Sequence, residues 1–142
     1  MVKKQHVQRI LIEADTVAFP DASGDVNPVH LDYGFSTKTK FGKRIVYGML
    51  LYDLISAVLG TQLPGPGTIY VSQEFNLKSP VYIGDTATAL VEVINTRKDK
   101  SIYILSTVCL NQRNEVIIIQ HKLRCVCSRI KKGVFGYLNA SD

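Results

Sequence analysis

The sequence has little cysteine, with only Cys109, Cys125 and Cys127 among 142 residues. An odd number without the spacing of a disulfide framework excludes a disulfide-stapled scaffold and indicates reduced thiols. Cys125 and Cys127 are two residues apart in a strand-like run, and a zinc site would need more ligands than this pair supplies. We therefore expect three inert, buried cysteines and no metal site.

The sequence also lacks a long uncharged apolar run. Residues 1–8 are polar and basic, and no apolar segment of a secretory signal follows them. The longest weakly charged stretch, Ile45 to Gly60, contains Asp53 and is shorter than the ~20 apolar residues of a membrane helix. We expect no membrane association, and a location in the cytoplasm of a bacterium or, in a eukaryote, in the mitochondrial matrix.

Charged residues are few as well, at 20% of the chain, and neither repeats nor low-complexity blocks occur. With 46% hydrophobic residues, the chain can form one core, which predicts a single domain over residues 1–142 with a basic C-terminal tail at 129–142. The net charge of +5 favours acidic or phosphorylated partners. The basic residues carry no nucleic-acid-binding signature, which argues against nucleic acid.

The apolar pattern predicts one long helix followed by strands. Val46–Leu59 leaves almost no polar face, which is typical of a helix buried all round, and Gly60 ends it. Before it we expect a strand, a short helix and a loop, at residues 5–12, 13–22 and 23–43. After it, short polar connections between β-rich runs indicate an antiparallel meander at residues 68–79, 85–96, 101–110 and 115–128.

This order of elements predicts a hot-dog fold, an α+β architecture in which a curved antiparallel sheet wraps around a long buried helix. Strands this long in a small domain leave open edges, and pairing of two copies would cover them. We expect a homodimer or a higher homo-oligomer.

The segment most typical of chemistry is Ser23–His30, which sets the carboxylate of Asp25 close to the imidazole of His30 on a constrained loop. A short helical turn from Pro28 would let both side chains converge on one water molecule, and Asn27 can cap that turn. Hydration of an enoyl thioester needs such general acid/base chemistry. Alternatively, these residues are loop caps with no catalytic role.

A second candidate is Gly48, at the start of the long helix. The first N–H groups of a helix lack intrahelical partners and can hold a developing oxyanion at its positive end. A glycine there lets a substrate approach the backbone closely. It is equally consistent with simple helix packing.

Taken together, the motifs resemble the MaoC-like family of (R)-specific enoyl-CoA hydratases and 3-hydroxyacyl-thioester dehydratases. The resemblance covers most of the chain and rests on an ordered series of motifs: Phe19, GDxNPxH at 24–30, FGxRIVxGM at 41–49, IS at 55–56, LG at 59–60, PGPGTIY at 64–70, SQ at 72–73, PV at 80–81 and GD at 84–85.

The resemblance implies a lyase of fatty acid metabolism, without a cofactor, that acts on acyl-CoA or acyl-carrier-protein thioesters. It implies that Asp25 and His30 hold the catalytic water, that Gly48 donates its N–H to the thioester carbonyl, and that Asn27 and Ser56 support the site. Tyr47 departs from the usual histidine but can still donate a hydrogen bond to the site. Pro20 falls where the family commonly has alanine.

Basic residues between the two motifs could meet the phosphates of coenzyme A or of a phosphopantetheine arm; these candidates are Lys40, Lys43 and Arg44, with Lys38 nearby. A solvated basic loop is the alternative. Two other functions remain open on this fold, an acyl-thioester hydrolase and a non-catalytic subunit that binds an acyl carrier.

Overall fold

The computed structural model describes residues 3–127, so the basic tail expected at 129–142 lies outside the described residues. The chain begins with a strand, three helices and the long helix: β1 (Lys4–Ile10), α1 (Glu13–Ser23), α2 (Pro28–Leu31), α3 (Tyr33–Ser36) and α4 (Gly48–Thr61). Strands and one 3₁₀ turn follow: β2 (Thr68–Gln73), β3 (Asn76–Leu77), β4 (Thr86–Arg97), η1 (Lys98–Lys100), β5 (Ile102–Leu110) and β6 (Val116–Cys127).

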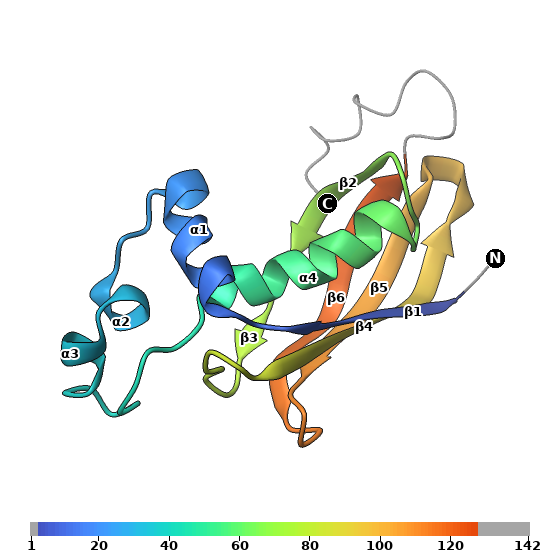
Figure 1. Ribbon diagram of the computed structural model, residues 1–142. Helices are drawn as coiled ribbons and strands as arrows, with labels where there is room; N and C mark the ends of the chain where they lie inside the picture. The colour runs from blue at the N-terminus through green and yellow to red at the C-terminus, as the bar shows by residue number, and fades with distance from the viewer. Residues whose placement is uncertain (1–2, 128–142) are drawn as a thin grey trace.

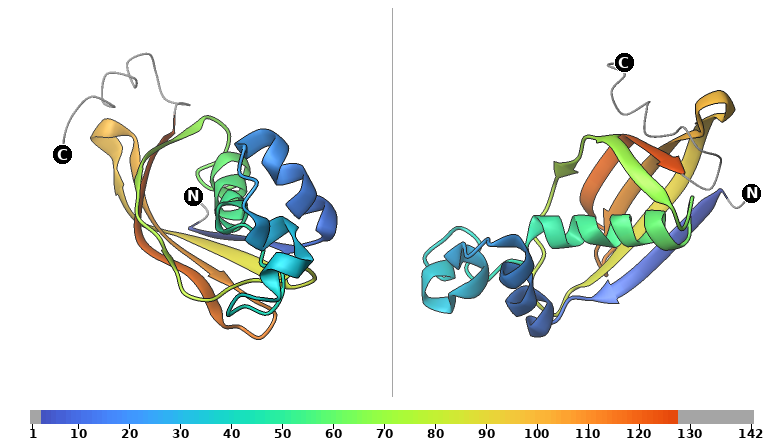
Figure 2. Two further views of the ribbon diagram at one scale, coloured as in Figure 1. Left: turned by 90° about the vertical axis from the view of Figure 1, so that its left-hand side faces the viewer. Right: turned by 90° about the horizontal axis from the view of Figure 1, so that it is seen from above.

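The strands form one antiparallel sheet in the order β1-β4-β5-β6-β2, and β3 also pairs with β6. The sheet curves around α4, which runs across its concave face, while α1 to α3 project beyond one end (Figures 1 and 2). This is the hot-dog fold, as the sequence predicts.

Helix α4 packs one face against the sheet. Its buried residues are Leu51, Tyr52, Leu54, Ile55, Val58 and Leu59. They meet small residues of β4, Ala87 and Ala89, and larger ones of β6 such as Leu123. Among the described residues, no helix is long and apolar enough to cross a membrane.

The prediction that this helix is buried all round is wrong for the single chain. Met49, Asp53 and Ala57 are four residues apart and exposed, so they form a stripe along the helix. Half of Met49 is accessible to solvent. The sheet covers only one side of the helix, and a simple count of apolar residues cannot reveal which side is left open.

The meander holds only for β4, β5 and β6. The run at 68–79 divides into β2 and β3, and both pair with β6 rather than with the strand that follows them. Gly84 and Asp85 lie in a turn in which the Asp85 N–H donates to the Tyr82 carbonyl, but this turn does not join paired strands. The region 23–43, expected to be a loop, contains α2 and α3.

All three cysteines are free and buried, as expected. Burial raises the pKa of Cys109 and of Cys125 to about 12. These two thiols therefore stay protonated and unreactive near neutral pH.

Candidate active site

The candidate site lies where the overhanging segment, residues 11–47, meets the start of α4 (Figure 1). Helix α1 ends at Ser23 and is capped by Gly24, whose φ of 73° is left-handed and suits a glycine. Helix α2 then begins at Pro28, and the Asn27 side chain accepts the N–H of Val29 at 3.1 Å. Asn27 therefore serves as the cap that the sequence predicts.

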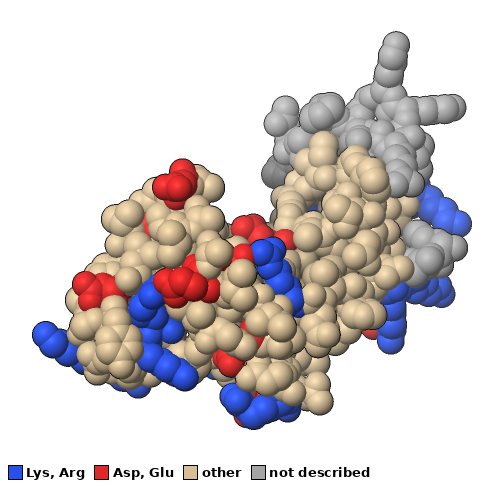
Figure 3. Space-filling view, in the orientation of Figure 1, with Lys and Arg blue, Asp and Glu red and all other residues tan. Residues whose placement is uncertain are grey.

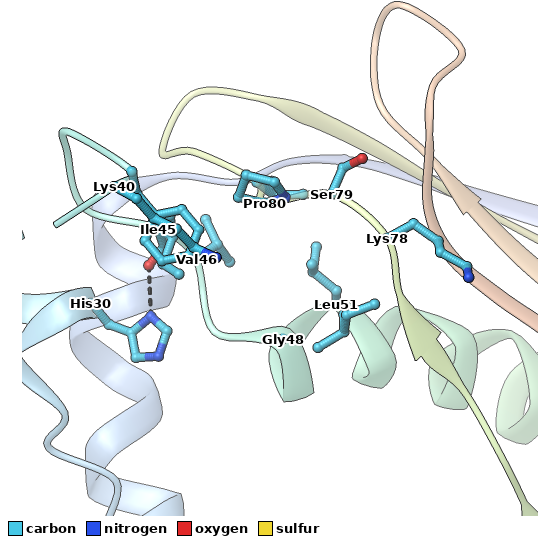
Figure 4. Close-up of a pocket in the computed structure, with 12 residues that line it drawn as sticks. His30, Lys40, Ile45, Val46, Gly48, Leu51, Lys78, Ser79 and Pro80 are labelled. Atoms are coloured by element: carbon cyan, nitrogen blue, oxygen red, sulfur yellow. Dashed lines mark hydrogen bonds between the residues drawn. The ribbon is translucent and has the colours of Figure 1, made fainter.

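His30 is buried on α2, and its neighbours fix both its place and its tautomer. Nδ1 lies 2.8 Å from the carbonyl oxygen of Ile45 (Figure 4). A carbonyl can only accept, so Nδ1 carries the proton and Nε2 keeps a free lone pair. Arg44 adds a bond from Nε to the His30 carbonyl at 2.7 Å. The imidazole is therefore oriented with a basic nitrogen available.

Asp25 sits on the loop before α2 and is exposed. Its Oδ1 accepts the N–H of Asn27 at 3.0 Å, and its own N–H donates to Ser23 Oγ at 3.1 Å. Its carbonyl oxygen accepts the hydroxyl of Tyr47 at 2.6 Å. The ring of Tyr47 also lies against that of His30, with centroids 4.0 Å apart. Asp25 and His30 are thus held against the same side chain.

A pocket of about 440 Å³ adjoins these residues. Figure 4 shows His30 from α2 and Gly48 from the start of α4 along one side of it, with Ser79 and Pro80 opposite. The remaining lining residues are Lys40, Phe41, Ile45, Val46, Leu51, Leu77, Lys78 and Val81. The structure therefore brings His30 and Gly48 to one cavity, whereas Asp25 does not line it and is linked to His30 through Tyr47.

Gly48 has the position that the sequence predicts for an oxyanion donor. The first intrahelical bonds of α4 run from Leu50 and Leu51 to the Tyr47 carbonyl, so the Gly48 N–H precedes them. A Cβ at this position would lie 2.8 Å from Cδ1 of Leu77. Leu77 is 53% exposed and its side chain can turn aside, so this contact favours a small residue but does not by itself require glycine.

Several candidates from the sequence do not line this pocket: Asp25, Asn27, Lys43, Arg44, Tyr47 and Ser56. Ser56 is eight residues beyond Gly48, about 12 Å along the helix, and lines a separate hollow between α4 and β2. Tyr47 is 1% exposed and commits its hydroxyl to the loop, so it contacts neighbouring residues of the chain rather than the cavity.

The basic residues that the sequence predicts to meet phosphates have different neighbours in the structure. Arg44 donates to Glu13 at 2.8 Å as well as to the His30 carbonyl, so it braces α1 and α2. The Lys43 ammonium lies 4.4 Å from the ring centroid of Tyr82. Lys40 lines the pocket.

Lys78 also lines the pocket, although no motif in the sequence indicates it. It follows the two-residue strand β3 and is exposed. No spacing in the sequence relates it to Lys40, because the loop that carries Lys40 and the segment after β3 border one pocket only in the folded chain.

The chain matches the model of the MaoC-like domain over residues 2–112, and it belongs to this family. It is 50% identical over 94 residues to the (R)-specific enoyl-CoA hydratase of Aeromonas caviae, covering 66% of this chain and 70% of that one. It is 37% identical over 113 residues to a mitochondrial 3-hydroxyacyl-[acyl-carrier-protein] dehydratase of Arabidopsis thaliana, covering 78% of this chain and 67% of that one.

Two solved structures of (R)-hydratases also superpose on this chain. The (R)-hydratase of A. caviae superposes with a TM-score of 0.83 at 39% identity, over 89% of this chain and 96% of that one. An unliganded R-hydratase from Pseudomonas aeruginosa gives a TM-score of 0.82 at 33% identity, over 94% of this chain and 88% of that one.

Proposed function

We propose that this chain is a hydro-lyase of fatty acid metabolism, catalysing (R)-specific hydration of trans-2-enoyl thioesters and the reverse dehydration of (R)-3-hydroxyacyl thioesters. The observation that carries the proposal is the meeting of His30 and Gly48 at one cavity, with Asp25 held beside them on a capped loop. The curated relatives named above are hydratases and dehydratases of this kind.

The mechanism uses only groups of this chain. A water held by Asp25 and by Nε2 of His30 gives up a proton as its oxygen bonds to C3 of the enoyl group. The electrons of the C2–C3 double bond move toward the thioester carbonyl, whose oxygen gains negative charge. The Gly48 N–H at the positive end of α4 stabilises that charge. The group that took the proton of the water, Asp25 or His30, then gives a proton to C2 as the carbonyl forms again, and dehydration follows the same path backwards.

The assay that tests this proposal measures two signals from crotonyl-CoA, longer enoyl-CoAs and carrier-linked enoyl groups. We expect loss of the conjugated enoyl absorbance without release of free thiol. Release of thiol with the enoyl absorbance intact would identify an acyl-thioester hydrolase instead. Inactivity on every chain length and both carriers would point to the non-catalytic subunit.

The thioester's carrier, coenzyme A or a carrier-protein arm, brings phosphate to the pocket mouth, where Lys40 and Lys78 are exposed. Neutralising both, as Lys40→Gln with Lys78→Gln, should raise KM about two- to thirtyfold at low salt, because exposed ion pairs contribute about 0.2–1 kcal/mol each. The kcat should stay near that of the parent.

The matched control for this pair replaces two lysines of η1, Lys98→Gln with Lys100→Gln, which lie outside the pocket lining. The KM difference between the pairs should shrink at high salt, because screening shortens the reach of charges to ~8 Å at physiological ionic strength. Equal KM values for both pairs at low salt would assign Lys40 and Lys78 to a solvated surface.

We also propose that two copies pair. Within residues 3–127, strand β2 is an edge of the sheet, and residues 71–73 on it are exposed. In Figure 3 Lys and Arg lie beside Asp and Glu on the overhanging segment, whereas the face over α4 is mostly uncharged. An uncharged face beside an open edge suits association with a second copy. We place the protein in a bacterial cytosol or a mitochondrial matrix.

A further inference from the structure

Tyr47 joins the two halves of the candidate site. It is the residue before Gly48 and forms the N-cap of α4. Its hydroxyl donates to the Asp25 carbonyl at 2.6 Å, across 22 residues of sequence. Its ring lies between those of Phe19 and His30, with centroid distances of 4.5 Å and 4.0 Å.

We propose that Tyr47 is a positioning residue that sets the acid/base loop at a fixed distance from the oxyanion donor. This inference rests on the proposed function of Asp25, His30 and Gly48. The loop carrying Asp25 is on the surface and is bound within itself by bonds to Ser23 and Asn27. The Tyr47 hydroxyl ties that loop to the rigid helix whose first residue is Gly48.

The hydrogen bond from Tyr47 to the Asp25 carbonyl stays intact across the pH range in which enzymes work. Burial raises the pKa of Tyr47, and the negative charge of Asp25 raises it further, against a smaller lowering by Arg44. The phenol therefore remains a neutral donor. A histidine, the residue that the family resemblance implies at this position, titrates near pH 6.5 and can change charge beside His30.

The test is Tyr47→Phe, which removes one oxygen atom and keeps the ring between Phe19 and His30. We expect kcat to fall about 10- to 100-fold, because small misplacements of catalytic groups have effects of this size. The KM should stay near the parent's, because Tyr47 does not line the pocket. A parallel rise in KM with unchanged kcat would overturn the positioning role.

Two control variants distinguish the effect of losing the Tyr47 hydroxyl from the effect of altered ring packing. Tyr52→Phe removes a hydroxyl from another buried tyrosine of α4, whose ring stacks on Phe75, and should leave kcat near the parent's. Phe19→Leu weakens the ring packing on the far side of Tyr47 but keeps its hydroxyl, and should affect kcat less than Tyr47→Phe. The reverse order would assign Tyr47 to packing alone.

If Tyr47→Phe does not fold, 3-fluorotyrosine introduced at position 47 is the second variant. Its phenol is more acidic, so it loses the donated proton at a lower pH than the parent's. The kcat should therefore decline earlier at the alkaline end of the pH profile. A profile identical to that of the parent would overturn the proposal.

Hydrogen exchange gives a readout that needs no turnover. In Tyr47→Phe the amides of residues 25–27 should exchange faster than in the parent, and in Tyr52→Phe they should not. Unchanged exchange in Tyr47→Phe would show that the Tyr47 hydroxyl does not hold the loop. A parent that hydrates no enoyl thioester would instead refute the proposed function, and the exchange comparison would still decide whether Tyr47 holds the loop.

Discussion

Asp25→Asn should lose at least about 10²-fold in kcat while folding as the parent does, because a positioned acid or base contributes 10²- to 10⁴-fold. Asparagine has the shape of aspartate, and its side-chain oxygen can still accept the Asn27 N–H that Asp25 Oδ1 accepts at 3.0 Å. The backbone bonds to Ser23 and Tyr47 are untouched. Only the ability to take a proton is lost.

The matched control is Asp32→Asn. Asp32 lies on the same overhanging segment and makes the same kind of bond, accepting the N–H of Phe35 at 2.8 Å as the cap of α3. The hydroxyl of Tyr47, whose ring lies against His30, bonds to Asp25 and not to Asp32, so this variant should keep the parent's kcat. If Asp25→Asn retained the parent's thermal midpoint and also its rate, Asp25 would not be the acid or base.

The second large effect is expected for His30→Asn. The side-chain amide of asparagine can replace Nδ1 as the donor to the Ile45 carbonyl, a bond of 2.8 Å in the parent. It offers nothing in place of Nε2. The kcat should therefore fall about 10²- to 10⁴-fold with little loss of stability.

His30→Gln is the complementary variant, because its longer amide reaches toward the position of Nε2 and leaves the Ile45 carbonyl without its donor. This change should lower the thermal midpoint more than His30→Asn does. An active, fully stable His30→Asn enzyme would show that the imidazole is only a structural partner of Ile45.

The double variant Asp25→Asn/His30→Asn tests whether the two residues act on one water. Their effects should not multiply, because once either group is gone the other has little left to orient. The double variant should then resemble the slower single one. A product of the two separate losses would indicate two independent roles.

The parts of the fold that the sequence predicts are those that depend on local pattern. The apolar run of α4 and the β-rich runs behind it define the helix and the long strands. The predicted ends of the helix are wrong, because α4 begins at Gly48 rather than Val46 and continues through Gly60 to Thr61. Strand pairing depends on the whole chain, since β2 and β3 pair with the distant β6 and not with β4, the next long strand in the sequence. The stripe of Met49, Asp53 and Ala57 is likewise exposed only because the sheet covers one side of α4.

The candidate site likewise contains some features that the local sequence predicts and others that depend on the whole chain. Asp25, Asn27 and His30 lie within one turn of chain, and their spacing predicts their proximity, while the helix start predicts the place of Gly48. The bond from Tyr47 to Asp25 and the place of Lys78 on the pocket are long-range contacts that no local pattern encodes. Arg44 illustrates the limit, because its charge suggested phosphate binding whereas Glu13 and the His30 carbonyl occupy its guanidinium.

The configuration of the product tests the central claim most directly. Purified protein is incubated with crotonyl-CoA, and the 3-hydroxybutyryl-CoA formed is separated by chiral chromatography, with Asp25→Asn as the blank. The account predicts predominantly the (R) product, formed by the parent and not by the variant. Predominantly (S) product would mean that water reaches the other face of the enoyl group, and would contradict the placement of Asp25, His30 and Gly48 around the substrate.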